Sequence, residues 1–185
     1  MSESGDILPI GETGELWVKG PNVCDGYFNN PEATANMMAP DGFLKTGDIG
    51  YQDKEGDFYI TDRLKELIKY KGFQVAPAEL EGVLLGHDKV DDVCVLGVYD
   101  TARATENPRA YVVRAASAKS IENSVLEKEI HQWFNAKVSN HKQLRGGIRY
   151  VDMIPKSPSG KILRRILRDK MRAEEVEQEV AKSKL

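Results

Sequence analysis

The sequence predicts an α+β fold, in which a compact domain over 62–172 follows a β-rich segment. Three observations favour this class. Strand-like and helix-like stretches alternate after Asp62, and the residues before it carry turn signals without a helix long enough to cover a sheet. The 185 residues are 41% hydrophobic and 30% charged, which is the composition of a globular protein. A chain of this length has room for one ample core or two small ones.

The first third of the chain, residues 1–61, is dominated by turns and short strands. Gly, Pro, Asn and Asp recur every few residues, and the residues between them alternate between apolar and polar. Such a segment would struggle to close a core alone. Its predicted elements are a turn and strand over 11–20, a short helix opening at Pro31 with Asn29 or Asn30 near its start, and a hairpin of 50–53 and 57–61.

The remaining residues alternate between strands and helices. Apolar residues at Ile121, Val125, Ile130 and Phe134 recur at helical spacing. A sheet of three strands with helices packed on it therefore accounts for the compact domain. The predicted elements are strands over 93–98, 109–115 and 148–154, helices over 79–86, 121–138 and 161–180, and a loop over 100–108.

The stretch 62–81 concentrates positive charge. Lys65, Lys69 and Lys71 share one face if the segment is a strand, whereas Lys65 and Lys69 are i,i+4 neighbours if it is a helix. Both alternatives bring the cations together. Gly72 lets the backbone turn or lie close to a ligand. Taken alone, such a cluster is more typical of a solvated face than of a binding site.

Composition narrows the classes of function. Lys plus Arg is 26 and Asp plus Glu is 29, so the net charge of −3 argues against a general nucleic-acid binder. No apolar run approaches the length of a membrane span. Cys24 and Cys94 are far apart, which favours a reducing intracellular compartment. His87, His131 and His141 lack the spacing of metal ligands, so no metal site is expected.

Gly160 and Lys161 superficially suggest a phosphate-binding P-loop. That motif needs a glycine five residues before the second one and Ser or Thr after the lysine, where this chain has Pro155 and Ile162. The P-loop is therefore rejected. What remains is a lysine on a Ser/Gly/Pro loop beside the start of a helix, and both the ammonium group and the helix end favour an anion there.

The last segments are polar. The basic stretch 161–172 is followed at once by four glutamates, which favours a solvated helix docked by its apolar face over a nucleic-acid or membrane surface. Ser183, Lys184 and Leu185 stand at the end of a polar tail. They match the peroxisomal import tripeptide, which is an address read by a receptor.

Four motifs in this order resemble the adenylate-forming superfamily, closest to 4-coumarate–CoA ligases, acyl-CoA synthetases and firefly-type luciferases. The motifs are Gly14-Glu15-Leu16, Thr46-Gly47-Asp48, the stretch 62–81 and the loop 155–161. The resemblance implies that 1–61 is the end of a large domain's β region and that 62–172 is the small C-terminal lid domain. Residues 173–185 are then a polar tail, and the rest of the large N-terminal domain is expected as a missing partner.

The resemblance also assigns roles to residues. In this family a carboxylate first attacks the α-phosphate of ATP, and the CoA thiol then attacks the acyl-adenylate. Negative charge crowds the first transition state, so a positioned lysine would stabilise it. A domain rotation can then bring a second lysine to the same site for the second step. ATP, Mg²⁺ and CoA are the expected cofactors. The resemblance implies that Asp48 and Arg63 contact the nucleotide and that Lys65 is the hinge. It implies that Lys161 acts in adenylation. It also implies that Lys69 and Gln74 face the acyl-adenylate, and that Lys71 and Gly72 lie near CoA.

These implications define the C-terminal part of a peroxisomal, AMP-forming acid–CoA ligase, whose partners are a carboxylic acid, ATP, CoA and the peroxisomal import receptor. Two alternatives stay open: a luciferase-like adenylating oxygenase, whose branch the run 144–147 resembles, and a non-catalytic nucleotide- or CoA-binding module. The chain alone is expected to be inactive or nearly so, because the upstream phosphate loop and acyl pocket are absent. The identity of the acid is left open for the same reason.

Overall fold

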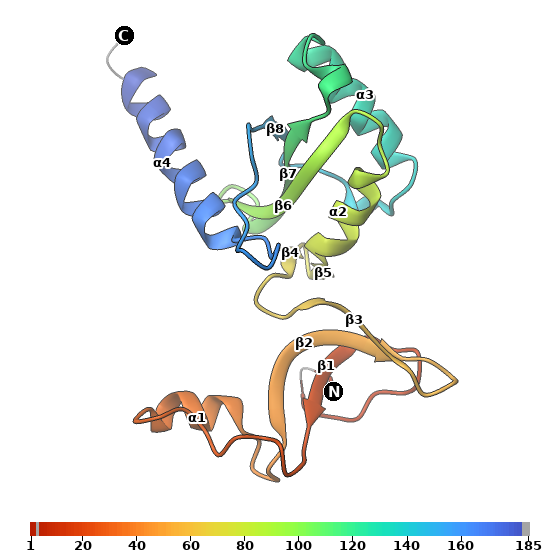
Figure 1. Ribbon diagram of the computed structural model, residues 1–185, viewed down its shortest axis with the longest axis vertical. Coiled ribbons are helices and arrows are strands. Elements are labelled where there is room, and N and C mark those ends of the chain that lie inside the picture. Colours follow the sequence, from red (N-terminus) through yellow and green to blue (C-terminus); the bar gives the residue numbers. More distant parts are fainter. Residues whose placement is uncertain (3, 183–185) are drawn as a thin grey trace. The chain divides into compact units, whose positions relative to one another are not determined.

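The computed structural model describes residues 1–2 and 4–182, and the chain divides into two compact units, Met1–Leu67 and Ile68–Leu185 (Figure 1). The sequence-based division at Asp62 falls earlier, inside a strand. Asp48 pairs with Arg63 and Ile49 with Asp62, so the first unit continues through these residues to the turn that follows.

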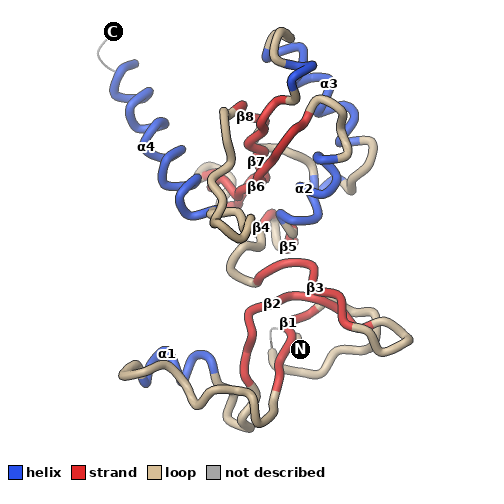
Figure 2. Tube along the Cα trace, viewed as in Figure 1, coloured by secondary structure: helices blue, strands red, loops and turns tan. Residues whose placement is uncertain are grey.

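The first unit is a three-stranded antiparallel sheet in the order β1-β2-β3, and one short helix lies in the connection between β1 and β2 (Figure 2). Asn30 caps the helix, because its side-chain oxygen accepts the Ala33 N–H at 3.0 Å, and Pro31 occupies the first turn. The predicted hairpin is confirmed. The elements are β1 Gly14–Val18, α1 Pro31–Met37, β2 Leu44–Gln52 and β3 Phe58–Arg63.

This unit has a small core. Ala39 and Ile49 are its buried hydrophobic residues within the described part of the chain. Phe58, Tyr59 and Ile60 on β3 are each about half exposed or more. The expectation that the first third buries little apolar surface therefore agrees with the structure.

The second unit contains a hairpin, a three-stranded sheet and three α-helices. In the sheet order β6-β7-β8, β6 and β7 are antiparallel whereas β7 and β8 are parallel. The fold class predicted from the sequence is confirmed. The elements are β4 Ile68–Tyr70, β5 Phe73–Val75, α2 Pro77–Leu85, β6 Val90–Asp100, β7 Thr105–Arg114, α3 Asn123–Asn135, β8 Ile148–Tyr150 and α4 Arg164–Lys182.

The sheet of the second unit is covered on both faces (Figure 1). Because side chains alternate along a strand, Val93 and Val95 of β6 face the core beneath α2 and α3, whereas Cys94 and Leu96 face the opposite side. On the first side Phe134 of α3 is fully buried. On the second side the sheet packs against Leu167 and Met171 of α4. The helices thus fix the sheet from which the candidate site is built.

Three sequence-based boundaries are wrong. The predicted loop 100–108 is mostly strand, because Thr105 through Pro108 pair with β6 and leave only a tight turn. The strand predicted over 148–154 ends at Tyr150. The last helix begins at Arg164, because a β-bridge between Lys156 and Ile162 holds the preceding residues extended.

The charged stretch 62–81 is neither one strand nor one helix. Lys65 lies in the turn that follows β3, whereas Lys69 lies in β4 and Lys71 in the next turn. A separate helix, α2, then starts at Pro77. The three lysines therefore do not line one face of a single strand. Lys65 belongs to the first unit, whereas Lys69 and Lys71 belong to the second.

The described residues include no helix that is both long enough and apolar enough to cross a membrane.

Candidate functional site

The first group of predicted site residues lies where β2 and β3 pair. Asp48 and Arg63 are opposite each other in the sheet, and the Arg63 Nε lies 3.0 Å from the Asp48 Oδ1. The Arg63 side chain is 58% exposed and that of Asp48 is 29% exposed. The sheet therefore brings these two residues together and leaves both within reach of a ligand.

The Thr46-Gly47-Asp48 motif forms a hydrogen-bonded corner in β2. The Thr46 hydroxyl accepts the Asp48 N–H at 3.0 Å and donates to the Leu16 carbonyl at 2.7 Å. The Glu15 carboxylate accepts the Gly47 N–H at 2.9 Å. Gly47 has φ 72°, which a residue with a side chain rarely adopts. The two short motifs singled out in the sequence thus contact each other and hold the Asp48 backbone in place.

An open pocket of about 690 Å³ lies beside this corner. Its lining includes Glu15, Thr46, Gly47, Arg63 and Lys65. Lys65 therefore shares a pocket with Arg63, at the end of the first unit. Asp48 does not line this pocket, but it makes an ion pair with Arg63, which does.

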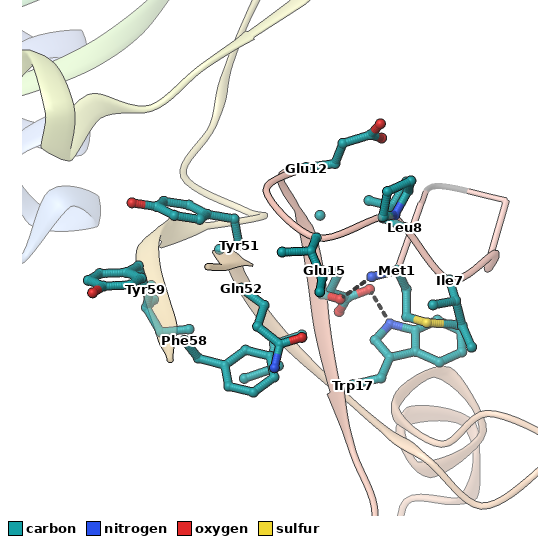
Figure 3. Close-up of a pocket in the computed structure, with 16 residues that line it drawn as sticks. Met1, Ile7, Leu8, Glu12, Glu15, Trp17, Tyr51, Gln52, Phe58 and Tyr59 are labelled. Atoms are coloured by element: carbon teal, nitrogen blue, oxygen red, sulfur yellow. Dashed lines mark hydrogen bonds between the residues drawn. The ribbon is translucent and has the colours of Figure 1, made fainter. Parts of the chain in front are cut away.

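A second pocket of the first unit, of about 240 Å³, is lined largely by apolar residues (Figure 3). Met1, Ile7, Leu8, Trp17 and Phe58 surround it. The Glu15 carboxylate accepts the Trp17 indole N–H at 2.8 Å there, and the Met1 ammonium donates to the Glu15 carbonyl at 2.8 Å. The sequence-predicted site residues do not line this pocket, and we assign no chemistry to it.

In the second unit, the β4–β5 hairpin carries four predicted site residues. Lys69 and Gln74 are directly opposite each other. Lys71 and Gly72 form the two-residue turn, with φ of 46° and 83°. Positive φ at both central residues is the signature of a type I′ turn, which fits the twist of a hairpin. The hairpin therefore holds these four residues within one small structure.

The hairpin is attached to the main sheet by the first residues of its central strand, β7. The Glu106 carboxylate accepts the Lys69 N–H at 2.8 Å, and the Thr105 hydroxyl accepts the Lys71 N–H at 2.7 Å. The Thr105 hydroxyl also donates to the Lys69 carbonyl at 3.1 Å. Thr105 is buried. Sequence reasoning missed both supporting residues because it assigned them to a loop.

Beside the hairpin turn lies an open, positively charged pocket of about 540 Å³. Its lining residues are Tyr70, Lys71, Arg103, Asn107, Asn140 and Arg145. The Arg145 guanidinium lies 5.2 Å from the centre of the Tyr70 ring, and the Lys71 Nζ lies 5.6 Å from it. Both distances are within the range of cation–π attraction. The buried Tyr70 ring thus gathers two cations at one edge of the pocket.

Arg103 supplies a third cation to this pocket and is held by a carboxylate behind it. Its Nη1 donates to Asp100 Oδ2 at 2.9 Å, and this hydrogen bond holds the pKa of the Asp100 carboxyl below its usual value. Asn107 donates to the same oxygen at 3.2 Å. Three cations and two amides suit a ligand with several negative charges. No sequence signal joined Arg103 to Arg145, because the fold alone brings them together.

Lys161 lies on a loop that folds back on itself. The Ser157 N–H donates to the Lys161 carbonyl at 2.8 Å, and the Lys161 N–H donates to the Ser157 hydroxyl at 3.1 Å. Gly160 has φ 82° at the bend. The Lys161 side chain is exposed and does not line the pocket beside the hairpin turn. The structure therefore places Lys161 and Lys71 on two different features of the same unit.

The second unit thus combines a sheet covered on both faces with a hairpin that has a lysine in its turn and with a separate loop that carries Lys161. Residues 79–161 match the model of the AMP-binding enzyme C-terminal domain. The chain is 52% identical over 168 residues to a probable 4-coumarate–CoA ligase 3 from Dictyostelium discoideum, and 49% identical over 162 residues to a luciferin 4-monooxygenase from Luciola mingrelica.

A crystal structure of ATP-bound MatB from Rhodopseudomonas palustris resembles the chain with a TM-score of 0.80 and 32% sequence identity, over 91% of this chain and 32% of that one. The match to the Dictyostelium protein covers 91% of this chain and 29% of the relative, and the match to the Luciola protein covers 88% and 28%. The chain therefore contains an AMP-binding enzyme C-terminal domain, and it spans about 30% of the length of the relatives that it matches.

We assign no chemical step to a metal ion held by this chain. Within the described residues, no three His, Cys, Asp or Glu side chains gather in an arrangement that could hold one. Mg²⁺ usually binds through one or two carboxylates together with substrate phosphates.

Proposed function

We propose that the protein is an AMP-forming acid–CoA ligase, in which this chain supplies the hinge and the small domain. The observation that carries the proposal is the separation of Lys161 from Lys69 and Lys71 on two features of one domain. A reaction in two steps at one site needs two sets of groups, and rotation of a small domain can present each set in turn. The chain's similarity to CoA ligases supports this reading.

In the first step, a carboxylate oxygen of the acid attacks the α-phosphate of ATP, an acyl-adenylate forms and pyrophosphate leaves. The exposed Lys161 ammonium would stabilise the negative charge that develops on the phosphate oxygens. Asp48 would accept hydrogen bonds from the ribose hydroxyls, and Arg63 would hold Asp48 in place and contact the nucleotide. ATP would bind as its Mg²⁺ complex, in which the phosphate oxygens would supply most of the ligands of the metal ion.

In the second step, the thiol sulfur of CoA attacks the acyl carbonyl carbon, the thioester forms and AMP leaves as the C–O bond to the phosphate breaks. Lys69 and Gln74, opposite each other on the hairpin, would face the acyl-adenylate. The phosphates of CoA fit the pocket lined by Lys71, Arg103 and Arg145, because that pocket presents three cations. Gly72 would let CoA approach the backbone of the turn.

ATP–pyrophosphate exchange, measured with a panel of aryl and fatty acids on the protein expressed from its complete coding sequence, tests the proposal. We expect exchange that depends on one class of acid, and thioester formation when CoA is added. Adenylation followed by light emission and no thioester would favour the luciferase-like alternative, which the similarity to a luciferin 4-monooxygenase supports. Binding of ATP or CoA without exchange would favour a non-catalytic module.

We also propose that the protein is imported into peroxisomes by the receptor that reads Ser183, Lys184 and Leu185. These three residues lie outside the described part of the structure. A fluorescent protein carrying the last residues of this chain at its own carboxyl terminus should accumulate in peroxisomes. The same reporter without the tripeptide should stay in the cytosol, and equal localisation of the two would contradict the address.

A further inference from the structure

Arg164, the first residue of α4, makes a buried ion pair with Glu81 of α2. The Arg164 Nη2 lies 2.9 Å from Glu81 Oε2, and its Nη1 contacts Oε1, so the pair is bidentate. The side chains are only 13% and 9% exposed. Nη1 also approaches Cys94 Sγ at 3.3 Å and the Val95 carbonyl at 3.4 Å. A guanidinium held in this way fixes direction as well as distance.

The same ion pair joins three elements. Glu81 Oε1 accepts the Val95 N–H of β6 at 2.7 Å, so the carboxylate is fixed to the sheet before it binds Arg164. The start of α4 is thereby anchored to the middle of β6.

A second ion pair anchors the other end of the Lys161 loop to the same strand. Lys156 Nζ lies 2.7 Å from Asp92 Oδ2, and Asp92 Oδ1 accepts the Val93 N–H at 3.0 Å. Between the anchors, Lys156 and Ile162 form a β-bridge that closes the loop. Lys161 therefore lies on a closed loop whose two ends are tied to β6.

Stability alone does not explain why the anchor at Arg164 is charged. Removing two charges from water is costly, and a buried ion pair can often be replaced by apolar residues without loss of stability. What an apolar pair would not reproduce is the directional, two-point attachment of the helix start. That attachment matters only if something nearby must be placed accurately, and Lys161 is three residues away.

We propose that Arg164 is a positioning residue, which binds Glu81 and thereby holds the Lys161 loop in the orientation that adenylation requires. This inference rests on the proposed function, because it concerns the placement of the adenylation lysine. Arg164 does not itself touch the reacting atoms. It acts through the loop, with Lys156 and Asp92 serving the other end.

The test compares four variants of the protein expressed from its complete coding sequence: Arg164→Met, Arg164→Lys, Glu81→Gln with Arg164→Met, and Arg165→Met. Glu81→Gln removes the charge but keeps an oxygen that can accept the buried Val95 N–H. The last is a matched control, since Arg165 is the neighbouring arginine and its side chain is 91% exposed. The double variant removes both charges and should unfold at a temperature close to wild type. Its loop amides over 156–162 should nevertheless exchange faster, and ATP–pyrophosphate exchange should fall by about 10- to 100-fold.

Thioester formation from a supplied acyl-adenylate should stay close to wild type in the double variant, because it does not use Lys161. Arg164→Lys keeps the positive charge but cannot make two parallel hydrogen bonds to the Glu81 carboxylate. Its adenylation rate should therefore stay below that of the wild type. A stable double variant with wild-type adenylation and wild-type loop exchange would overturn the inference, as would full rescue by lysine. If wild-type protein shows no ATP–pyrophosphate exchange, the proposed function fails, and amide exchange alone then decides whether Arg164 orders the loop.

Discussion

The two lysines proposed to act in catalysis are exposed side chains whose attachments to the fold differ. Lys161 stands on the loop tied to β6, whereas Lys69 lies on a strand of the hairpin tied to β7. We predict that Lys161→Ala slows adenylation by about 10²- to 10³-fold, the usual cost of removing one preorganised donor, and leaves thioester formation from a supplied acyl-adenylate nearly unchanged. Lys69→Ala should adenylate nearly normally and stall at the CoA step.

The two half-reactions are measured separately, by ATP–pyrophosphate exchange and by consumption of a synthetic acyl-adenylate with CoA. Lys119→Ala is the matched control, because Lys119 is exposed and lies outside both the loop and the hairpin. Equal loss of both steps in Lys161→Ala and in Lys69→Ala would refute the separation of roles.

Tyr150 provides a residue-level prediction about alkaline stability. Its hydroxyl is buried without a hydrogen-bond partner in the described structure. Burial, and then the Glu127 carboxylate, raise the pKa of Tyr150 to about 12. A raised pKa means that the fold favours the neutral phenol. The resulting stabilisation is complete below pH 10, the ordinary pKa, and is lost as pH rises toward about 12.

We therefore predict that Tyr150→Phe unfolds at a denaturant concentration close to wild type at neutral pH and loses less stability than wild type between about pH 10 and 12. Denaturant unfolding across that range measures the difference. Phenolate absorbance of the variant should lack the transition that Tyr150 gives at about pH 12 in the wild type. Parallel pH profiles for the two proteins would contradict the assignment.

At the scale of single elements, the β4–β5 hairpin combines a local cost with a functional role. Lys71 has φ 46°, a left-handed conformation that costs an ordinary L-residue about 1–2 kcal/mol, whereas asparagine tolerates it better. Asn-Gly is also the preferred pair for a type I′ turn. We predict that Lys71→Asn raises the free energy of unfolding by up to about 1 kcal/mol and weakens CoA binding.

Urea unfolding and calorimetric titration with CoA measure the two effects on the same variant. Gly72→Ala is the comparison, since it adds strain at φ 83° without removing a charge and should lower stability by about 1–2 kcal/mol. A variant at Lys71 that is less stable than wild type, or that binds CoA equally well, would count against this account.

Local pattern was enough to predict most elements, and tertiary contacts explain where it failed. Pro31 with Asn30 predicted α1. The helical spacing of Ile121, Val125, Ile130 and Phe134 predicted α3. Thr105 and Glu106 read as loop residues because they are polar, yet they pair with β6 and hold the hairpin. A polar strand of this kind is stabilised by partners far along the chain, which local sequence does not display.

The contrast between local sequence pattern and tertiary contacts also holds for the candidate site. Asp48 and Arg63 could be singled out because each belongs to a motif, and the sheet register then paired them. Arg103 and Arg145 carry no motif that links them, and they line one pocket through the fold alone. Arg164 read as one cation of a basic helix, although its side chain is buried against Glu81. Burial of a charge is visible only in three dimensions.

The whole molecule consists of two units with unequal cores. The second unit buries a continuous apolar cluster between its sheet and two helices, with Leu80, Leu126, Ile130 and Phe134 fully buried. The first unit has few buried hydrophobic residues among those described. Because slow amide exchange requires opening of buried, hydrogen-bonded structure, we predict that the slowest amides lie in β6, β7, α2 and α3, and that amides before Leu67 exchange faster.

A core variant extends this prediction to the independence of the two units. Leu80→Ala removes a fully buried side chain and should destabilise the second unit by about 2–5 kcal/mol. Hydrogen exchange should then accelerate throughout Ile68–Leu85 and the sheet, while protection in β2 and β3 stays as in wild type. Leu85→Ala in the same helix is the control, because Leu85 is 50% exposed and its loss creates no cavity. If Leu80→Ala accelerated hydrogen exchange equally in both units, the two units would unfold as one cooperative body. That result would contradict the division of the chain at Leu67.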